Sequence, residues 1–213
     1  MSKIFLNKLR YQYKKGELKQ ENMHDDPVLQ FNDWFNQVLK TDLLDPNAMH
    51  LSTVCESNKP NNRVVLLKQF DQKGFVFFTN FNSKKGDHIA KNPNVCLTFY
   101  WRNLERQVRV EGRASQIEDF LSDEYFHTRS RESQLAAWSS NQSSKIASRV
   151  ELENKIKDYG IKYPNKVPHK ITITAESYLK AMRNPVKKRI TERTFALQMD
   201  IFPDATGLFF FVG

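Results

Sequence analysis

Two stretches of the 213-residue chain combine cationic side chains with hydroxyl groups. An apolar run begins with Arg63 and ends with Lys68, and a second stretch carries Tyr125, Arg129 and Ser133 within nine residues. A phosphate monoester has a charge of about −1.5 to −2 and three acceptor oxygens, so its site favours guanidinium or ammonium groups joined by hydroxyl donors. The two stretches therefore predict a site for phosphorylated small molecules.

The alternation of side chains along a strand divides the first stretch between two faces. In an extended chain Arg63 and every second residue after it face one side, while Lys68 belongs to the other set. The two charges can therefore serve different ligands. A buried strand with ordinary charged ends is the alternative, and this segment by itself favours it. For the stretch from Tyr125 to Ser133, a plain surface loop is the alternative.

A further pair of cations, Lys84 and Lys85, follows a residue that can cap a helix, Ser83. The pattern predicts a short helix over 83–92 with both lysines in its first turn, where free backbone N–H groups already attract an anion. A solvated turn of a surface helix is the simpler interpretation of the pair in isolation.

The known catalytic motifs are missing from the sequence. It contains no GxGxxG, no Walker A loop, no HExxH and no metal-ligand spacing among its five histidines. His127 has no carboxylate placed by a recognisable motif to orient it, and Ser133 lacks a nucleophile elbow. No catalytic residue or metal site is therefore predicted, and if the chain is an enzyme we expect an organic cofactor to supply the chemistry.

Bulk properties restrict the class of protein. The length suits one domain, and no apolar run approaches the ~20 residues that span a bilayer, so no membrane association is expected. Cys55 and Cys96 have no CxxC partner and no export signal is apparent, which predicts a cytoplasmic protein with reduced thiols. The net charge of +9 is spread along the chain without a nucleic-acid-binding motif, so we expect no nucleic acid partner.

Periodicity predicts the elements that must position these residues. Residues 1–25 are predicted to form an arm, and 26–213 a single domain that opens with a helix capped by Asp26. Strand patterns at 48–55, 62–70, 74–80, 94–101 and 106–117 predict an antiparallel barrel or sandwich. Helical patterns follow at 119–129, 132–140 and 148–160, and strand patterns at 171–175 and 194–202. The predicted class is mainly β with peripheral helices (α+β).

Many spaced segments resemble the FMN-dependent pyridoxamine 5′-phosphate oxidase family. They run from about Leu9 to Pro168 and include LRYQYKKGEL, AMHLSTV, NRVVLLKQFDQKGFVFFTNFNSKKGDHIAKNPNVCLTFYW, LERQVRVEG and YFHTRSRESQLAAWSSNQSS. The resemblance implies an FMN-binding split β-barrel that works as a homodimer, with two flavins at the subunit interface.

Site residues follow from the resemblance, position by position. The implied FMN contacts are Arg63, Val64, Val65, Leu66, Leu67, Lys68, Phe78, Thr79, Lys84, Lys85, Gln107, Gln142 and Ser143. The implied substrate contacts are Lys68, Tyr125, Arg129 and Ser133 around the phosphate, with Arg10 and Tyr13 from an arm that closes as a lid. The implied reaction oxidises pyridoxamine or pyridoxine 5′-phosphate to pyridoxal 5′-phosphate, with dioxygen as acceptor and hydrogen peroxide as product.

The resemblance ends at Pro168. The family continues with a Trp-Gly-Gly motif and later an Arg-Leu-His-Asp-Arg motif, whereas this tail offers only RITER, with Arg189 and Arg193 at the arginines and Thr191 in place of the histidine. The absent tryptophan would have contacted FMN, and the absent histidine would have held the reacting end of the substrate.

Three explanations for this divergent tail, residues 169–213, stay open. They are divergence to another substrate, loss of oxidase activity with ligand binding retained, and a change of reading frame. The apolar terminal run 207–213 favours a damaged or strand-paired end. Two alternative functions follow: a related flavin oxidase with a different ring substrate, as in phenazine pathways, or a non-catalytic protein that binds FMN or pyridoxal phosphate.

Overall fold

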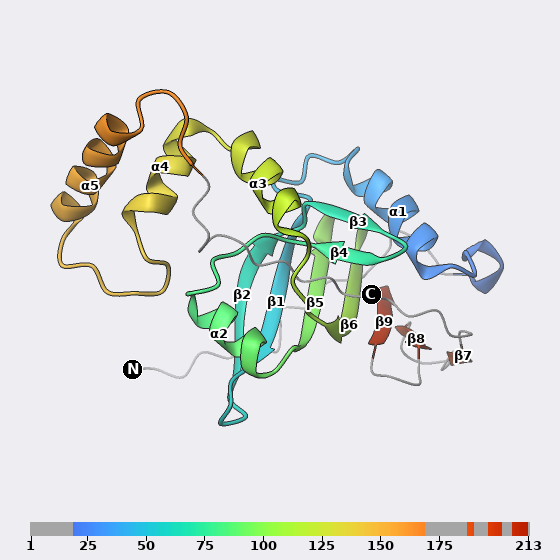
Figure 1. Ribbon diagram of the computed structural model, residues 1–213. Coiled ribbons are helices and arrows are strands. Elements are labelled where there is room, and N and C mark those ends of the chain that lie inside the picture. Colours follow the sequence, from blue (N-terminus) through green and yellow to red (C-terminus); the bar gives the residue numbers. More distant parts are fainter. Residues whose placement is uncertain (1–18, 169–186, 190–195, 202–205, 213) are drawn as a thin grey trace, which may run out of the picture.

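A seven-stranded antiparallel sheet is the centre of the computed structural model, which describes residues 19–168, 187–189, 196–201 and 206–212. The strand order is β2-β1-β5-β6-β9-β8-β7 (Figure 1). The strands are β1 (Ala48–Val54), β2 (Pro60–Leu66), β5 (Asn94–Trp101), β6 (Arg106–Arg113), β7 (Lys187–Arg189), β8 (Ala196–Ile201) and β9 (Thr206–Val212). A separate hairpin pairs β3 (Gln69–Asp71) with β4 (Gly74–Val76).

Helices cover the sheet and extend from it. They are η1 (Gln20–Asn22), α1 (Pro27–Val38), α2 (Lys84–Lys91), η2 (Arg102–Leu104), α3 (Asp119–Thr128), α4 (Arg131–Ser139) and α5 (Arg149–Lys162). Figure 1 shows α1 near the β3–β4 hairpin, and α4 with α5 lying away from the sheet. The last two are held by a small apolar cluster of their own around Leu135 and Val167. The three helices predicted between 119 and 160 are confirmed.

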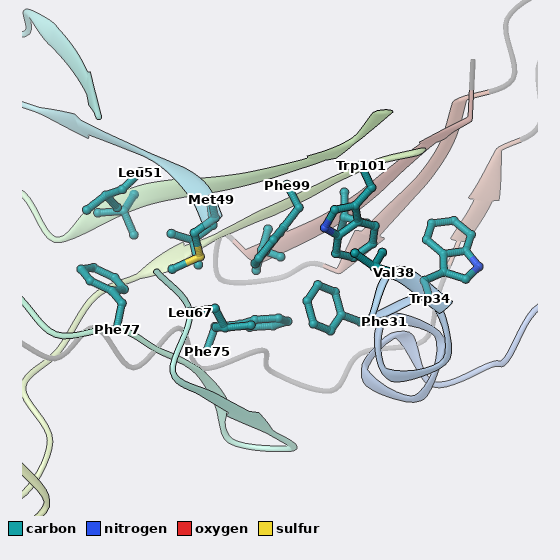
Figure 2. Packing of buried hydrophobic residues seen from close by; sticks show 14 of the residues in the cluster. Phe31, Trp34, Val38, Met49, Leu51, Leu67, Phe75, Phe77, Phe99 and Trp101 are labelled. Atoms are coloured by element: carbon teal, nitrogen blue, oxygen red, sulfur yellow. The ribbon is translucent and has the colours of Figure 1, made fainter. Parts of the chain in front are cut away.

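One face of the sheet builds the main core. Apart from Thr53, the large side chains of β1, β5 and β6 that point to this face are apolar, and α1 and the hairpin pack over them (Figure 2). Phe31 of α1 is fully buried, with ring centroids of Phe70, Phe75 and Phe99 at 4.8, 4.9 and 5.0 Å in edge-on arrangements. Because aromatic pairs favour such edge-to-face packing, this cluster fixes α1 and the hairpin against the sheet.

The predicted strand over 62–70 is wrong as a single element. β2 ends at Leu66, and the next N–H groups leave the ladder: Leu67 donates to the Asn47 carbonyl at 2.9 Å and Lys68 to the Val76 carbonyl at 2.8 Å. The chain therefore turns into the hairpin at Lys68, because its backbone donors find partners outside β1. The predicted strand over 74–80 likewise ends early, at Val76.

The last three strands extend the sheet at β6. Within the segment predicted over 194–202, β8 spans Ala196–Ile201, and β9 pairs Phe210 with Val108 of β6. Of the two expectations for the chain end, damaged or strand-paired, the structure shows the strand-paired one. The strand predicted over 171–175 and the arm predicted over 1–25 fall outside the described residues, apart from 19–25.

The N-cap of α1 offers a first stability test. Asp26 Oδ1 accepts the Val28 N–H at 2.8 Å, and Oδ2 accepts from Gln72 Nε2 of the hairpin at 2.8 Å. We expect Asp26→Ala to lower the free energy of unfolding by about 1–2 kcal/mol, since the change removes both contacts. Asp26→Asn keeps the cap, so it should lower the free energy of unfolding by only about a few tenths of a kcal/mol. Urea denaturation of the two variants measures the difference, and equal stabilities would contradict the role of the cap.

Candidate functional site

Lys85 lies in a polar corner at the start of α2. Ser83 caps the helix, as predicted, by accepting the Gly86 N–H at 3.3 Å. The Lys85 side chain is 8% exposed, and its Nζ donates to Gln142 Oε1 at 2.9 Å and to Ser83 Oγ at 3.3 Å. Lys84, one residue earlier, is exposed. The helix therefore turns one lysine of the predicted pair inward and the other toward solvent.

Arg63 lies on the inner side of β2, near Lys85. Its Nη1 donates to the Leu51 carbonyl and to Thr53 Oγ1, both at 2.9 Å, and its Nη2 donates to Asn61 Oδ1. Burial lowers the pKa of the Arg63 guanidinium. Burial and, secondarily, the charge of Arg63 lower the pKa of Lys85 to about 8. Two partly buried cations that repel each other form a site prepared for an anion. We call Arg63 and Lys85 the cation site.

A pocket of about 320 Å³ lies next to the cation site. Its lining residues are Phe78, Thr79, Asn80, Tyr125, Arg129, Ala136, Ala137, Ser140 and Gln142. Gln142 joins the two sites, because Oε1 accepts from Lys85 Nζ at 2.9 Å and from Thr79 Oγ1 at 3.5 Å. We call this cavity the aromatic pocket.

The aromatic pocket takes its name from a stacked pair of rings. Phe78 and Tyr125 lie with centroids 3.7 Å apart and planes 3° from parallel. Lys68 Nζ lies 5.6 Å from the Tyr125 ring centroid, and Arg129 lines the same cavity. The structure therefore brings together three of the four residues predicted around the substrate phosphate: Tyr125 and Arg129 come from α3 and its C-cap, and Lys68 from a distant part of the sequence.

The fourth residue, Ser133, lies beside the pocket without lining it. Its Oγ accepts from Ser130 Oγ at 3.0 Å, and Ser130 caps α4 by accepting the Ser133 N–H. Ser143 is exposed and has a positive φ of 66° in the turn after Gln142. Among the described residues, neither the Ser133 nor the Ser143 hydroxyl is hydrogen-bonded to Arg63 or Lys85.

The run from Arg63 to Lys68 divides as the alternation predicts. Arg63, Val65 and Leu67 are half-buried or buried, whereas Val64 is 58% and Leu66 37% exposed on the opposite face. Register places Tyr100 and Gln107, which pair with each other, on that same exposed side. We call the side that bears Val64, Leu66, Tyr100 and Gln107 the outer face.

Gln107 is far from the cation site within one chain. Two strands, β1 and β5, separate β6 from β2, which amounts to about 14 Å across the sheet. Gln107 also lies on the outer face, whereas Arg63 belongs to the inner one. A single chain therefore does not assemble all of the predicted FMN contacts around one point.

Several predicted residues fall outside the described part of the chain. These are Arg10 and Tyr13 of the arm and Thr191 and Arg193 of the tail. Arg189 is described only through its backbone, which pairs with Gln198 in β7 and β8. The contribution of the arm and tail to the site thus stays a prediction.

The structure adds two site residues that the sequence interpretation missed, Thr53 and His88. Thr53 follows the buried Met49 and Leu51 on the inner side of β1, and His88 follows Lys85 by one helical turn on the buried side of α2. Both positions could have been read as inward-facing from periodicity alone. Their contact, described below, joins residues 35 positions apart, and no local signal encodes it.

Within the described ranges, no helix is long and apolar enough to cross a membrane. The same residues contain no cluster of three or more His, Cys, Asp or Glu side chains arranged to hold a metal ion.

Comparison with known proteins gives the family. The family model for pyridoxamine 5′-phosphate oxidase matches residues 35–162. The chain is 46% identical over 157 residues to a pyridoxine/pyridoxamine 5′-phosphate oxidase of Nostoc sp. strain PCC 7120, covering 74% of this chain and 73% of that protein. It is 45% identical over 164 residues to the protein of the same name from Burkholderia mallei strain SAVP1, covering 76% and 77%.

Solved structures show the same fold. PhzG from Burkholderia lata 383, solved with tetrahydrophenazine-1-carboxylic acid, superposes with a TM-score of 0.71 at 18% identity over 84% of this chain and 81% of that one. A pyridoxamine 5′-phosphate oxidase-related FMN-binding protein from Nostoc punctiforme PCC 73102 gives 0.57 at 17% identity, over 77% and 84%. The predicted α+β split barrel is confirmed. Sequence and fold agree, and the chain belongs to the pyridoxamine 5′-phosphate oxidase family.

Proposed function

We propose that the chain is an FMN-dependent oxidase that converts pyridoxamine or pyridoxine 5′-phosphate into pyridoxal 5′-phosphate, with dioxygen as acceptor and hydrogen peroxide as product. The main support for the proposal is that the cation site and the aromatic pocket are joined by a common side chain. Thr79 and Gln142 line the aromatic pocket, and Gln142 also binds Lys85 of the cation site. Two anion-binding groups thus lie side by side, as a phosphorylated cofactor next to a phosphorylated substrate requires.

The residues of the cation site fit the phosphate of FMN. Arg63 and Lys85 are both cationic and both partly removed from water, and the charge of Arg63 adds to burial in lowering the pKa of Lys85 to about 8. A dianion relieves that repulsion, and charge-assisted hydrogen bonds in a site of low dielectric are strong. When bound, FMN supplies the two-electron chemistry of the reaction. The role of this chain's residues there is to bind and orient.

In the aromatic pocket the substrate phosphate would be held by Lys68, Tyr125 and Arg129. The guanidinium binds two phosphate oxygens at once, the ammonium adds a second charge, and the phenol donates one hydrogen bond. Stacking on Phe78 fixes the Tyr125 ring and hence the direction of its hydroxyl. Anchoring the phosphate in this way positions the reacting carbon, which is attached to the pyridine ring, without an acid or base on the protein.

We also propose that two copies of the chain form the working unit. The outer face exposes Val64, Leu66 and Tyr100, all large and apolar, beside Gln107. Since Gln107 lies about 14 Å across the sheet from β2, a Gln107 contact to FMN is most simply supplied by a second copy seated on this face. We place the enzyme in the cytoplasm, because Cys55 and Cys96 are free thiols.

A related oxidase with another ring substrate is the second candidate. The superposition with PhzG, solved with a phenazine carboxylic acid, favours it at the level of fold. Tyr125 and Arg129 in the lining of one cavity, with Lys68 over the Tyr125 ring, favour a phosphorylated substrate instead. A third candidate, a non-catalytic binding protein, differs from both by the absence of turnover.

The test is a flavin spectrum followed by a peroxide assay. We expect the purified chain to carry or take up FMN and to form peroxide with pyridoxine 5′-phosphate, with kcat/KM at least about 100-fold lower for unphosphorylated pyridoxine. Arg129→Leu should remove most of that preference, whereas Arg113→Leu, an exposed arginine at the end of β6, should not. A flavin-loaded protein without turnover of either phosphate ester would contradict the oxidase and leave the binding protein.

A further inference from the structure

A buried chain of hydrogen bonds links Arg63 to the middle of α2. Arg63 Nη1 donates to Thr53 Oγ1 at 2.9 Å, and Thr53 Oγ1 lies 3.0 Å from His88 Nδ1. Thr53 is fully buried, and His88 is 4% exposed. Three elements, β2, β1 and α2, are therefore joined by polar contacts, of which the one between Thr53 and His88 is buried.

The donor of the first bond in this chain can be assigned from its chemistry. A guanidinium only donates, so Thr53 Oγ1 accepts from Arg63. The single hydroxyl proton of Thr53 is then available for His88 Nδ1, which accepts only if it carries a lone pair. In the neutral ring with its proton on Nε2, Nδ1 accepts this proton. Because Thr53 Oγ1 has a second lone pair, the direction of the bond between Thr53 and His88 depends on the tautomer of the ring.

Electrostatics favour the same protonation state. Burial, then Arg63, Lys84 and Lys91, lower the pKa of His88, while Asp87 raises it. A protonated His88 would place a second cation on the oxygen that already accepts from Arg63. The neutral ring therefore holds the threonine without adding charge to the cation site.

Three bonds orient the Arg63 guanidinium. Nη1 is used twice, by Thr53 Oγ1 and the Leu51 carbonyl, and Nη2 once, by Asn61 Oδ1. Among the described residues these bonds occupy three of the five N–H groups of a guanidinium, so two are left for a ligand. Removing the Thr53 contact would leave Nη1 held only by the Leu51 carbonyl, so that end of the group would be less firmly oriented.

We propose that Thr53 and His88 are positioning residues, which direct the Arg63 guanidinium toward the phosphate of bound FMN. The inference rests on the function proposed above. His88 follows Lys85 by one turn on the same helix, so α2 directs Lys85 toward the ligand and His88 toward Thr53, which holds Arg63. These contacts therefore fix the positions of Arg63 and Lys85 relative to each other.

Matched variants test the proposal through FMN affinity, measured by quenching of flavin fluorescence on titration. Thr53→Val removes the hydroxyl at constant shape, and Thr53→Ser keeps it. His88→Leu removes the acceptor, and His88→Asn keeps an acceptor near the Nδ1 position. We expect the dissociation constant of FMN to rise about tenfold for Thr53→Val and His88→Leu, the value of one lost hydrogen bond to a charged group. The two conservative variants should stay within about twofold of wild type.

A double-mutant cycle separates positioning from simple support of the fold. In an Arg63→Met background, Thr53→Val should weaken FMN binding by less than about twofold, because there is no guanidinium left to direct. An equal loss in both backgrounds would overturn the proposal, as would wild-type affinity in both Thr53→Val and His88→Leu. Should Thr53→Val fail to fold, the two His88 variants decide. A wild-type chain that does not bind FMN would overturn the proposed function as well, so the two failures are distinguishable.

Discussion

Lys85→Met is expected to weaken FMN binding about 100-fold at pH 7, which corresponds to the loss of a charge-assisted contact to phosphate in a partly buried site. The side chain is 8% exposed and hydrogen-bonded to Gln142 and Ser83, so its ammonium group is held in place before the ligand arrives. Methionine retains the length and packing of the lysine stem but not its charge. Lys91→Met is the matched control, because Lys91 is exposed in the last turn of α2 and its loss should cost much less.

The pH dependence of FMN binding follows from the same residue. The pKa of Lys85 in the ligand-free chain is lowered to about 8 by burial and by Arg63. Bound phosphate stabilises the charged form and raises that pKa. Below pH 8 the ammonium is already present, whereas above pH 8 binding must take up a proton, so affinity falls as the pH rises.

The expected size of the effect is about tenfold weaker binding at pH 9 than at pH 7. The phosphate itself stays a dianion in this range, since its second pKa is about 6. Lys85→Arg should bind FMN with little change between pH 7 and pH 9, because a guanidinium does not titrate there. Fluorescence titrations of both proteins across this range measure the slopes. Parallel slopes for wild type and Lys85→Arg would show that another group is responsible.

Gly86→Ala is expected to disrupt the start of α2 and to weaken FMN binding by about 100-fold or more. This is the size of effect that a 1 Å misplacement of a binding group can cause. A Cβ at Gly86 would lie 2.1 Å from the Phe81 carbonyl oxygen and 2.7 Å from its carbon. Because the obstacle is backbone, the helix and the preceding turn must separate, and Lys85 moves with them. The free energy of unfolding should fall by about 2–3 kcal/mol.

Gly160→Ala is the control for Gly86→Ala. Its added Cβ would meet only the Leu135 Cδ1 atom, at 3.8 Å, and the position lies inside α5. Alanine is favoured over glycine in a helix interior by up to about 1 kcal/mol, so this variant should be slightly more stable than wild type. Urea denaturation and FMN titration of the pair give the comparison. Wild-type stability and affinity in Gly86→Ala would mean that the close approach to Phe81 is not required.

The elements that the sequence predicted best are those with local signals. Asp26 before Pro27 and Ser83 before Lys84 both predicted helix starts, and both side chains cap the helices as expected. A cap depends on a side chain and on backbone groups two or three residues away, so the information is contained in a short window. The inward set of each strand was equally predictable from alternation.

The errors in the fold concern partners that are distant in sequence. The run 62–70 has an uninterrupted strand composition, yet the chain leaves the sheet at Leu67 and Lys68. What decides this is the position of the carbonyls of Asn47 and Val76, which accept their N–H groups. A strand pattern describes which side chains are apolar, but not which backbone will lie alongside.

The candidate site shows the same division between local and long-range information. By itself the sequence determined the kinds of side chain that bind anions, Arg63, Lys68, Lys85 and Arg129, and the helix end that presents Lys85. Only the tertiary structure decided that Lys85 is buried against Gln142, that Tyr125 stacks on Phe78, and that Thr53 joins Arg63 to His88. The physical reason is that charge and hydrogen-bonding capacity belong to the residue type, whereas burial, a shifted pKa and a shared proton depend on neighbours that folding brings from elsewhere in the chain.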